Sequence, residues 1–260
     1  MGPGTKLPTL GHVKFTALRD AYAEQTAAMI EGGIDAVGIE TCQDLLQAKA
    51  AVIGARRAAE AAHVDLPIFV SVTVETTGAM LLGSEIGAAL ATLEPLGIDM
   101  IGLNCATGPA EMAEHLRHLS RHARVGVSCM PNAGLPQLSA QGAVYPLGPN
   151  EMAAALDDYT ARFGLSLVGG CCGTTPEHIR LLAETIGHRP VVVRQPEPTR
   201  ALASLYNEVP FDQDTSYLAV GERTNANGSK AFREAMLAAN WDECVAIAKS
   251  QSREGAHLAD

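Results

Sequence analysis

The sequence has few aromatic residues, few positive charges and no long hydrophobic run, and each of these absences excludes a class of protein. Aromatic residues make up 4% of the 260 residues, and 29 Asp and Glu against 19 Lys and Arg give a formal net charge of -10. An acidic chain with few rings to stack on bases is not typical of proteins that bind nucleic acids or anionic membrane surfaces. No apolar run approaches the roughly 18–20 residues of a membrane-spanning helix. We therefore expect neither a nucleic acid nor a membrane as partner.

The N-terminal residues also lack the apolar segment of a secretory signal peptide. The six cysteines are spread over a chain that is 47% hydrophobic and long enough to form a sizeable core. Such a chain does not depend on disulfides, and its thiols are more often used for metal binding or chemistry in a reducing compartment. We therefore expect a cytoplasmic protein with reduced cysteines.

Short apolar segments alternate with amphipathic helical patterns over the first 187 residues. Strands that alternate with helices predict a parallel sheet with crossover helices. An open doubly wound sheet can be built from five strands, whereas a (β/α)₈ barrel needs eight. No G-x-G-x-x-G follows any of the predicted strands, which argues against dinucleotide binding. The five predicted strands are residues 34–41, 68–74, 100–105, 125–130 and 165–170.

Two details of the predicted helices concern polar side chains. Ser84 precedes the helix that carries Ile86, Leu90 and Leu93, and serine is a favoured N-cap residue, so we expect it to cap this helix. Three histidines, at positions 115, 118 and 122, lie on one helix beside the stripe of buried leucines. We interpret these histidines as mostly exposed to solvent.

The pattern changes after residue 187. Residues 190–217 combine prolines and acidic residues without a clear period, which is typical of an ordered linker. Residues 218–221 then resemble a new strand, and helical patterns follow over residues 230–238 and 242–254. These last elements are too few to form a core of their own.

Three cysteines lie where predicted strands end, which is where functional groups gather in parallel α/β folds. Cys105 ends one strand, and Cys171 and Cys172 follow another about two strand–helix units later. Adjacent side chains on a regular strand point to opposite faces, so both thiols of the pair can bind one ion only if the chain leaves β geometry. Gly169, Gly170 and Gly173 supply that freedom. A zinc site and a pair of small core or oxidisable cysteines are both compatible with this spacing.

A site with three thiolates would favour a particular kind of reaction. Zinc bound by three thiolates carries a net negative charge, and it is therefore a weak Lewis acid toward water. Such an ion can still hold an incoming thiol as the thiolate at neutral pH. The ligand set thus predicts activation of a thiol substrate for attack on an activated carbon, rather than hydrolysis, for which histidine ligands are commoner.

Other polar and thiol residues near strand ends are weaker candidates. Glu40 ends a strand otherwise made of apolar residues and glycine, where a carboxylate would suit the ammonium group of a ligand or a salt bridge. Asn104 precedes Cys105 and could bind a substrate carboxylate or hold the loop in an Asx turn. Cys42 could face the site or pack in the core, and we expect Cys129 and Cys244 to be core residues.

Four segments resemble motifs of known families. GLNCATGP (102–109) and GGCCGTTPEHI (169–179) resemble the two zinc-ligand motifs of the homocysteine-binding domain family, and IETCQDLLQAKAA (39–51) is similar to another block of it. VGERTNANGSKAF (220–232) resembles the opening of the pterin-binding domain. The two domains in this order are typical of the cobalamin-dependent methionine synthase family, and the resemblance covers nearly the whole chain.

For the first domain, the resemblance implies a (β/α)₈ barrel of the homocysteine-binding type. It implies Zn²⁺ held by Cys105, Cys171 and Cys172, with the homocysteine sulfur as fourth ligand. Glu40 matches the family glutamate that binds the homocysteine ammonium group, and Asn104 lies in the matching Asn-Cys pair near the substrate. The implied enzyme is a methyltransferase that converts homocysteine to methionine.

For the second domain, the resemblance implies the start of another barrel. Glu222 and Asn225 match the first pterin-domain motif, which implies contact with folate. The implied methyl donor is methylcobalamin, which methyltetrahydrofolate regenerates. The implied partners are homocysteine and the folate and cobalamin modules of a full-length enzyme.

The chain departs from the family pattern at both ends. The family's N-terminal Asp-Gly motif and the first barrel strands are missing, residues 1–5 resemble the end of a third strand, and the pterin module is cut short. We therefore expect a fragment, with a truncated homocysteine-binding barrel over 1–188, a linker over 189–217 and the start of the pterin domain over 218–260. Unpaired strand edges predict that the isolated chain is poorly active and unstable. The rate of homocysteine-dependent demethylation of methylcobalamin measures the activity.

Two other functions remain open on the sequence. A stand-alone homocysteine S-methyltransferase that uses betaine or S-methylmethionine would need no pterin module, so residues 220–232 argue against it. A thiol-rich zinc-storage or redox-sensing protein is the non-enzymatic alternative. Zinc stoichiometry combined with a homocysteine titration distinguishes these classes.

Overall fold

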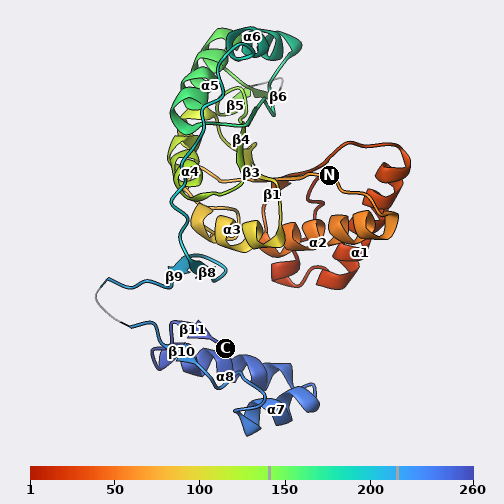
Figure 1. Ribbon diagram of the computed structural model, residues 1–260, viewed down its shortest axis with the longest axis vertical. Coiled ribbons are helices and arrows are strands. Elements are labelled where there is room, and N and C mark those ends of the chain that lie inside the picture. The colour runs from red at the N-terminus through yellow and green to blue at the C-terminus, as the bar shows by residue number, and fades with distance from the viewer. Residues whose placement is uncertain (140–141, 215–216) are drawn as a thin grey trace. The chain divides into compact units, whose positions relative to one another are not determined.

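The computed structural model describes residues 1–139, 142–214 and 217–260 (Figure 1). The chain forms two compact units, Met1–Glu208 and Val209–Asp260. The boundary between the units lies inside the segment that the sequence assigned to a linker. Across the described residues, no helix combines the length and the apolar character needed to cross a membrane.

The first unit is built on a parallel sheet with the strand order β1-β2-β3-β4-β7. Its strands correspond to the five predicted segments, so the prediction of a parallel α/β fold is confirmed. The last strand is shorter than predicted, because only two of its residues pair with β4. The strands are β1 (Val37–Cys42), β2 (Ile68–Val72), β3 (Met100–Asn104), β4 (Gly126–Met130) and β7 (Leu167–Val168).

The helices that connect these strands lie along one side of the sheet (Figure 1). Helix α1 precedes β1, and α2 to α6 each come after a strand in the chain, as expected for right-handed crossovers between parallel strands. The 3₁₀ turns Pro8–Leu10 and Glu94–Leu96 and a hairpin of β5 (Gln137–Ser139) and β6 (Gly142–Val144) complete the connections. The helices are α1 (Phe15–Glu31), α2 (Leu45–Ala62), α3 (Ile86–Leu93), α4 (Pro109–His122), α5 (Pro149–Phe163) and α6 (Pro176–Ile186).

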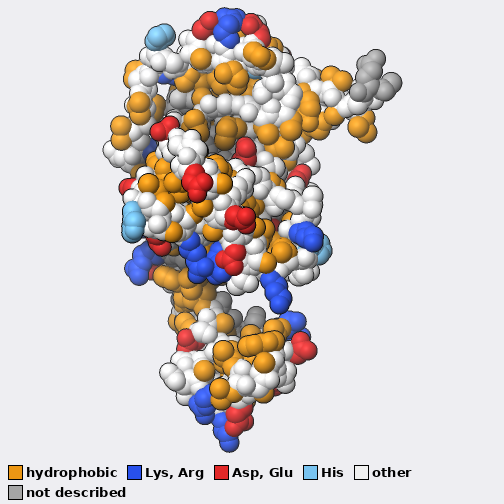
Figure 2. Space-filling model, turned by 90° about the vertical axis from the view of Figure 1, so that its right-hand side faces the viewer, with side chains coloured by type: hydrophobic (Ala, Val, Ile, Leu, Met, Phe, Trp, Pro, Cys, Tyr) orange, Lys and Arg blue, Asp and Glu red, His pale blue; other side chains and the backbone are white. Residues whose placement is uncertain are grey.

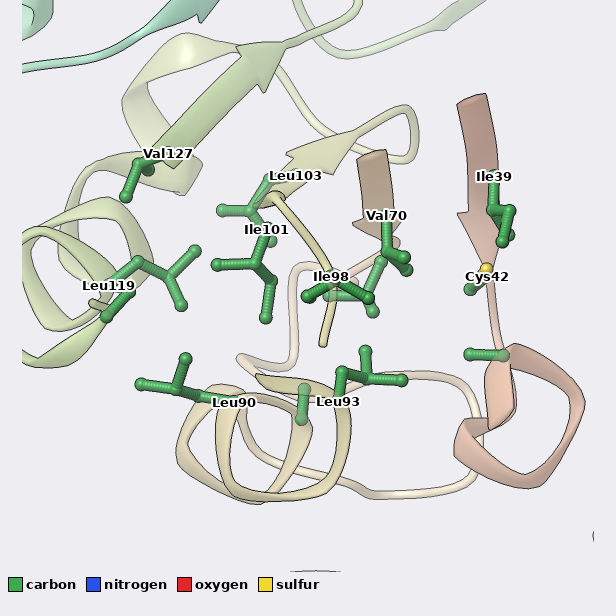
Figure 3. Close-up of a cluster of buried hydrophobic side chains, with 14 of the residues drawn as sticks. Ile39, Cys42, Val70, Leu90, Leu93, Ile98, Ile101, Leu103, Leu119 and Val127 are labelled. Atoms are coloured by element: carbon green, nitrogen blue, oxygen red, sulfur yellow. The ribbon is translucent and has the colours of Figure 1, made fainter. Parts of the chain in front are cut away.

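The hydrophobic core lies between the sheet and these helices. Ile39, Val70, Ile101 and Val127 come from four neighbouring strands, and each is at most 1% exposed. Figure 3 shows these side chains together with those of the helices, among them Leu119. Side chains alternate between the two faces of a strand, so every second residue of β1 to β4 is directed to this core.

On the opposite face of the sheet, strands β3 and β4 lie so close together that there is no room for a side chain at Gly102. Gly102 of β3 pairs with Ser128 of β4. A Cβ atom on Gly102 would lie 1.9 Å from Ser128 Oγ and 2.4 Å from the Ser128 carbonyl oxygen. Only glycine fits here, because the backbone of β4 occupies the space that a side chain would need.

The segment after α6 is held against the outside of the first unit. Arg194 donates hydrogen bonds to the carbonyls of Ser120 (3.1 Å) and Ala123 (2.9 Å) and also to that of Val125. These carbonyls lie at and just beyond the end of α4, where helical partners are lacking, so the guanidinium group caps the helix. The predicted linker is therefore ordered at this point. It also contains a two-stranded hairpin, β8 (Ala201–Ala203) and β9 (Glu208–Pro210), that the sequence did not predict.

The hairpin segment changes the expected role of Ser84. Ser84 is not the N-cap of α3, because Glu85 occupies the N-cap position. The Ser84 hydroxyl instead donates to the Leu205 carbonyl (2.5 Å), and the Glu85 N–H donates to the Tyr206 carbonyl (2.8 Å). The prediction was wrong because a contact distant in sequence competes with local capping for the same hydroxyl.

The histidines of α4 are half-buried rather than solvated, which corrects the interpretation from sequence. The ring centroids of His118 and His122 are 4.7 Å apart, and His122 Nδ1 lies 2.8 Å from the Glu197 carbonyl oxygen. Burial lowers the pKa of His118, and His122 and His115 lower it further. Burial also lowers the pKa of His115, against the opposing effect of Glu114.

These lowered pKa values predict that acid destabilises the first unit. The folded chain disfavours the charged histidines, whose ordinary pKa is 6.5. As the pH falls below about 6.5, the unfolded chain binds protons that the folded chain does not, so the free energy of unfolding decreases. We expect the variant with His115→Gln and His118→Gln to lose less stability between about pH 7 and pH 5. Urea unfolding at several pH values measures the free energy of unfolding of both proteins. The prediction would be contradicted if this free energy fell with pH as steeply in the variant as in the wild type.

The second unit, Val209–Asp260, is small and has few buried residues among those described. Strand β10 (Val220–Gly221) pairs in parallel with β11 (Leu258–Ala259), and α7 (Lys230–Leu237) and α8 (Trp241–Arg253) lie between them in the chain. Among its described residues only Ala235 and Gln251 are buried. Figure 2 shows hydrophobic side chains on the surface of this unit, and large residues such as Leu237 and Trp241 are exposed. The unit has no core of its own among these residues, as predicted.

Candidate metal centre

The three cysteines that the sequence selected come together in the structure. Cys105 follows β3 directly, and Cys171 and Cys172 lie in the loop between β7 and α6. Their Sγ atoms all lie within 4.8 Å of one another, and Cys105 Sγ is 3.7 Å from Cys172 Sγ. Within the described parts of the chain, no other group of three or more His, Cys, Asp or Glu residues has this geometry.

A left-handed turn directs the Cys105 thiol into the cluster. Cys105 and Ala106 have φ angles of 62° and 60°, a conformation that residues other than glycine rarely adopt. The Cys105 N–H still donates to the Met130 carbonyl of β4 (3.2 Å), and the Thr107 N–H donates to the Cys105 carbonyl (2.7 Å). The turn therefore begins immediately after the last strand pairing. Strained backbone of this kind is commonly found at functional sites.

The loop that carries the other two cysteines is held by the segment after β4. The Cys171 N–H donates to the Pro131 carbonyl (2.8 Å), and the Cys172 N–H donates to Asn132 Oδ1 (3.0 Å). The Ala133 N–H donates in turn to the Cys172 carbonyl (2.9 Å). These bonds hold both cysteines outside β geometry, so adjacent residues can direct their thiols to one centre.

The glycines around this loop serve in two different ways. Gly173 has a φ of +80°, and a Cβ there would lie 2.4 Å from Tyr145 Cβ. Gly170 does not adopt a left-handed φ, but a Cβ there would lie 2.2 Å from Thr174 Cγ2. The sequence predicted a need for conformational freedom, and the structure adds a need for space.

The environment of the sulfurs favours a bound cation. Burial raises the pKa of Cys105 to about 12, and the neighbouring cysteines contribute to this shift. Burial followed by the charge of Cys172 also raises the pKa of Cys171. Three thiolates this close repel one another, and a divalent cation among them removes that cost.

The spacing of the sulfurs also fits zinc. Tetrahedral zinc holds thiolates at about 2.3 Å, which places two sulfurs about 3.8 Å apart. The distance of 3.7 Å between Cys105 Sγ and Cys172 Sγ agrees with this geometry. Three protein thiols would leave one tetrahedral position for another ligand, as in catalytic rather than structural zinc sites.

Glu40 and Asn104 lie on the strands beside this cluster. Glu40 is exposed and sits in a bulge of β1, where two residues, Glu40 and Thr41, face the single residue Ser71 of β2. Asn104, which ends β3, is 1% exposed. Its Nδ2 lies 3.7 Å from Cys171 Sγ, so the structure brings Asn104 into contact with the cysteine cluster.

Glu222 and Asn225 belong to the second unit. Asn225 Nδ2 donates to Asp260 Oδ2 (2.9 Å), and its Oδ1 accepts from the Asn227 N–H (2.9 Å). Glu222 is exposed, and its carbonyl accepts a hydrogen bond from the Asn225 N–H (3.1 Å). Their interpretation as folate-binding residues stays a prediction.

The remaining cysteines have structural surroundings. Cys42 and Cys129 are fully buried in the core, which confirms the prediction for Cys129. The prediction was wrong for Cys244, which is only half-buried in α8 and does not belong to the core cluster. All six cysteines are free. Sequence reasoning missed Thr41, Asn132 and Tyr145 as neighbours of the site. Only the Pro-Asn-Ala-Gly turn at positions 131–134 signalled one of them.

The parallel α/β fold and the three-thiol cluster together define an α/β protein in which three cysteines that could hold a metal ion lie at the carboxyl ends of the strands. The chain belongs to the homocysteine S-methyltransferase family, whose model matches residues 1–186. In structure it is similar to the homocysteine methyltransferase MmuM from Escherichia coli in its apo form, with a TM-score of 0.54 and 22% identity. That similarity covers 71% of this chain and 60% of the other and concerns the fold.

The full length of the chain is similar to longer proteins. It is 64% identical over 260 residues to methionine synthase from Mycobacterium tuberculosis and 63% identical over 265 aligned residues to methionine synthase from Mycobacterium leprae. All of this chain is covered in both cases, but it spans only 22% of the length of either relative.

Proposed function

We propose that this chain is the zinc-dependent homocysteine-binding part of a cobalamin-dependent methionine synthase. The observation that carries the proposal is the convergence of Cys105, Cys171 and Cys172, whose Sγ atoms lie within 4.8 Å of one another. The similarity to two methionine synthases over the whole chain supports it. The six cysteines, spread over a long chain with a sizeable core, support a reducing, cytoplasmic location.

The reaction we propose joins the sulfur of homocysteine to a methyl carbon. The three cysteines would hold Zn²⁺, which keeps a substrate thiol deprotonated and nucleophilic at neutral pH. The carbon–sulfur bond would form as the bond between the methyl carbon and its donor breaks. The donor would keep the electron pair of that bond, and the thiol proton would be released to solvent. We propose methylcobalamin as that donor and methyltetrahydrofolate as the source of its methyl group, both bound by modules outside this chain.

The proposed enzyme also has a proposed architecture. We propose that the curved sheet and its helices form part of a (β/α)₈ barrel that lacks its first strands here. The Met1 carbonyl accepts a hydrogen bond from the Glu40 N–H of β1 (3.0 Å), which supports residues 1–5 as the end of a preceding strand. Residues 218–260 would begin a pterin-binding barrel in which Glu222 and Asn225 contact folate.

Two alternatives make different predictions. A methyltransferase that uses betaine or S-methylmethionine is disfavoured, because the two methionine synthases also match this chain beyond residue 186, where the family model ends. A zinc-storage or redox protein would bind metal without responding to an amino-acid thiol.

Zinc content and zinc X-ray absorption of the purified chain test the proposal. We expect one zinc per chain and three sulfur neighbours, rising to four when homocysteine is added. Homoserine, which carries a hydroxyl in place of the thiol, is the matched control ligand and should leave the sulfur count unchanged. A spectrum that homocysteine does not alter would favour the storage function and overturn the proposal.

Glu40 is the residue we propose to bind the homocysteine ammonium group. Glu40→Gln keeps the shape of the side chain but removes its charge, so we expect homocysteine to bind the zinc-loaded chain about 10- to 100-fold more weakly. Isothermal titration calorimetry measures this.

The control ligand for this prediction is 4-mercaptobutanoate, which lacks the ammonium group. It should bind the wild type and Glu40→Gln about equally, and Glu31→Gln on α1 should behave as the wild type. If Glu40→Gln weakened both ligands to the same extent, Glu40 would not be the ammonium site.

A further inference from the structure

The amide of Asn104 has no free polar group to offer a substrate. Its Oδ1 accepts a hydrogen bond from the Thr41 N–H (2.7 Å). Its Nδ2 donates to Thr41 Oγ1 (2.8 Å) and approaches Cys171 Sγ at 3.7 Å. A buried amide makes few bonds beyond these, and Asn104 is only 1% exposed.

The orientation of this amide follows from its partners. A backbone N–H can only donate, so the oxygen of the Asn104 side chain must face the N–H of Thr41. The NH₂ group is then directed to the Thr41 hydroxyl and to the sulfur of Cys171. The reverse orientation would place two donors against each other at 2.7 Å.

Thr41 has an unfavourable backbone conformation that depends on stabilising contacts. Its φ of 59° is rare for a β-branched residue, and it lies in the β1 bulge together with Glu40. The two hydrogen bonds between Thr41 and Asn104, one accepted and one donated by the amide, fix this turn from the end of β3, which lies beyond β2 in the sheet. Through Thr41 they also fix the backbone that carries Glu40.

We infer that Asn104 is a positioning residue that links the bulge carrying Glu40 to the metal ligand Cys171. The inference rests on the proposed function, because it assigns Asn104 to the support of the zinc site rather than to substrate contact. Groups that orient metal ligands in this way tune both their geometry and their electron donation. Asn104 thereby sets the site for the substrate ammonium group and the site for its sulfur relative to each other.

Asn104→Leu tests this inference, because leucine has a similar shape and no polar atoms. In the full 260-residue chain, we expect Zn²⁺ affinity, measured by competition with a chromophoric chelator, to fall about 10- to 100-fold. With Co²⁺ as the probe, we expect the sulfur-to-cobalt charge-transfer band to move to longer wavelength. Loss of the N–H donor raises the energy of the sulfur lone pairs, and a merely structural role would not cause this shift. Asn207→Leu, in the exposed turn between β8 and β9, is the matched control.

Substitution of Thr41 tests the same link without disturbing a buried residue. Thr41→Val removes the hydroxyl that accepts from Asn104, and we expect Zn²⁺ to bind about 2- to 10-fold more weakly. Thr41→Ser keeps the hydroxyl and should bind Zn²⁺ as the wild type does. If Asn104→Leu does not fold, the comparison of Thr41→Val with Thr41→Ser tests the inference in its place. Equal Zn²⁺ affinities of these two variants would overturn the inference.

The wild type separates this inference from the proposed function. A wild-type chain that takes up no Zn²⁺, or whose Co²⁺ spectrum ignores homocysteine, contradicts the proposed function itself. The outcome that contradicts only the role of Asn104 has two parts. The wild type binds Zn²⁺ and its Co²⁺ spectrum responds to homocysteine, while Asn104→Leu keeps the wild-type Zn²⁺ affinity and the wild-type position of the charge-transfer band.

Discussion

Cys172→Ser is expected to abolish stoichiometric zinc binding. The variant removes one of three sulfurs that all lie within 4.8 Å of one another, and the hydroxyl that replaces it is a poor ligand at neutral pH. We expect Zn²⁺ affinity to fall by on the order of 100-fold or more, and the response to homocysteine to disappear with it. Zinc content after dialysis and competition with a chromophoric chelator measure the loss.

Cys244→Ser is the matched control for this prediction. Cys244 is a free, half-buried cysteine of the second unit, so its substitution changes one thiol without touching the cluster. We expect one zinc per chain and unchanged affinity for this variant. Equal zinc contents of Cys172→Ser and Cys244→Ser would show that the metal is bound elsewhere.

Gly102→Ala is expected to destabilise the first unit severely. The added methyl group would lie 1.9 Å from Ser128 Oγ and 2.4 Å from the Ser128 carbonyl oxygen. The hydroxyl can rotate away, but the carbonyl belongs to the paired strand β4, so β3 and β4 must separate. Overpacking of this kind costs about 3 kcal/mol or more, which lowers the melting temperature by about 6–12 °C.

Far-UV circular dichroism is the appropriate measurement for this variant, because the one tryptophan, Trp241, belongs to the second unit. Gly38→Ala in β1 is the matched control. It makes the same change in a parallel strand of the same sheet, but its Cβ would meet no atom within 4 Å. We expect Gly38→Ala to melt close to the wild type, and a Gly102→Ala variant as stable as Gly38→Ala would contradict the predicted overlap.

Local patterns were sufficient to predict most of the secondary structure and to single out three cysteines that converge. The alternation of apolar segments and helical periods predicted the five strands of the parallel sheet and the helices between them. Because loops at the carboxyl ends of parallel strands share one edge, the positions of Cys105, Cys171 and Cys172 predicted their convergence. The glycines around the cysteine pair indicated that the chain leaves β geometry there.

Local sequence patterns could not predict the contacts between segments that are distant in the sequence. The hydroxyl of Ser84 bonds to Leu205 rather than to its own helix, and His122 of α4 is partly covered because the segment around Glu197 packs on it. The amide of Asn104 bonds to Thr41 rather than remaining free for a ligand. In each case a polar group has a local and a distant partner available, and the distant one is known only after folding.

The order of residue types along the chain therefore determined which segments become strands, which become helices and which thiols meet. Hydrophobic periodicity and glycine placement are local properties, and they can be recognised without knowledge of any tertiary contact. The tertiary structure alone decided how closely β3 approaches β4, which polar groups support the cysteines and where the segment after α6 packs. These features depend on strand register and on interatomic distances of a few ångströms, which the spacing of residues in a sequence does not contain.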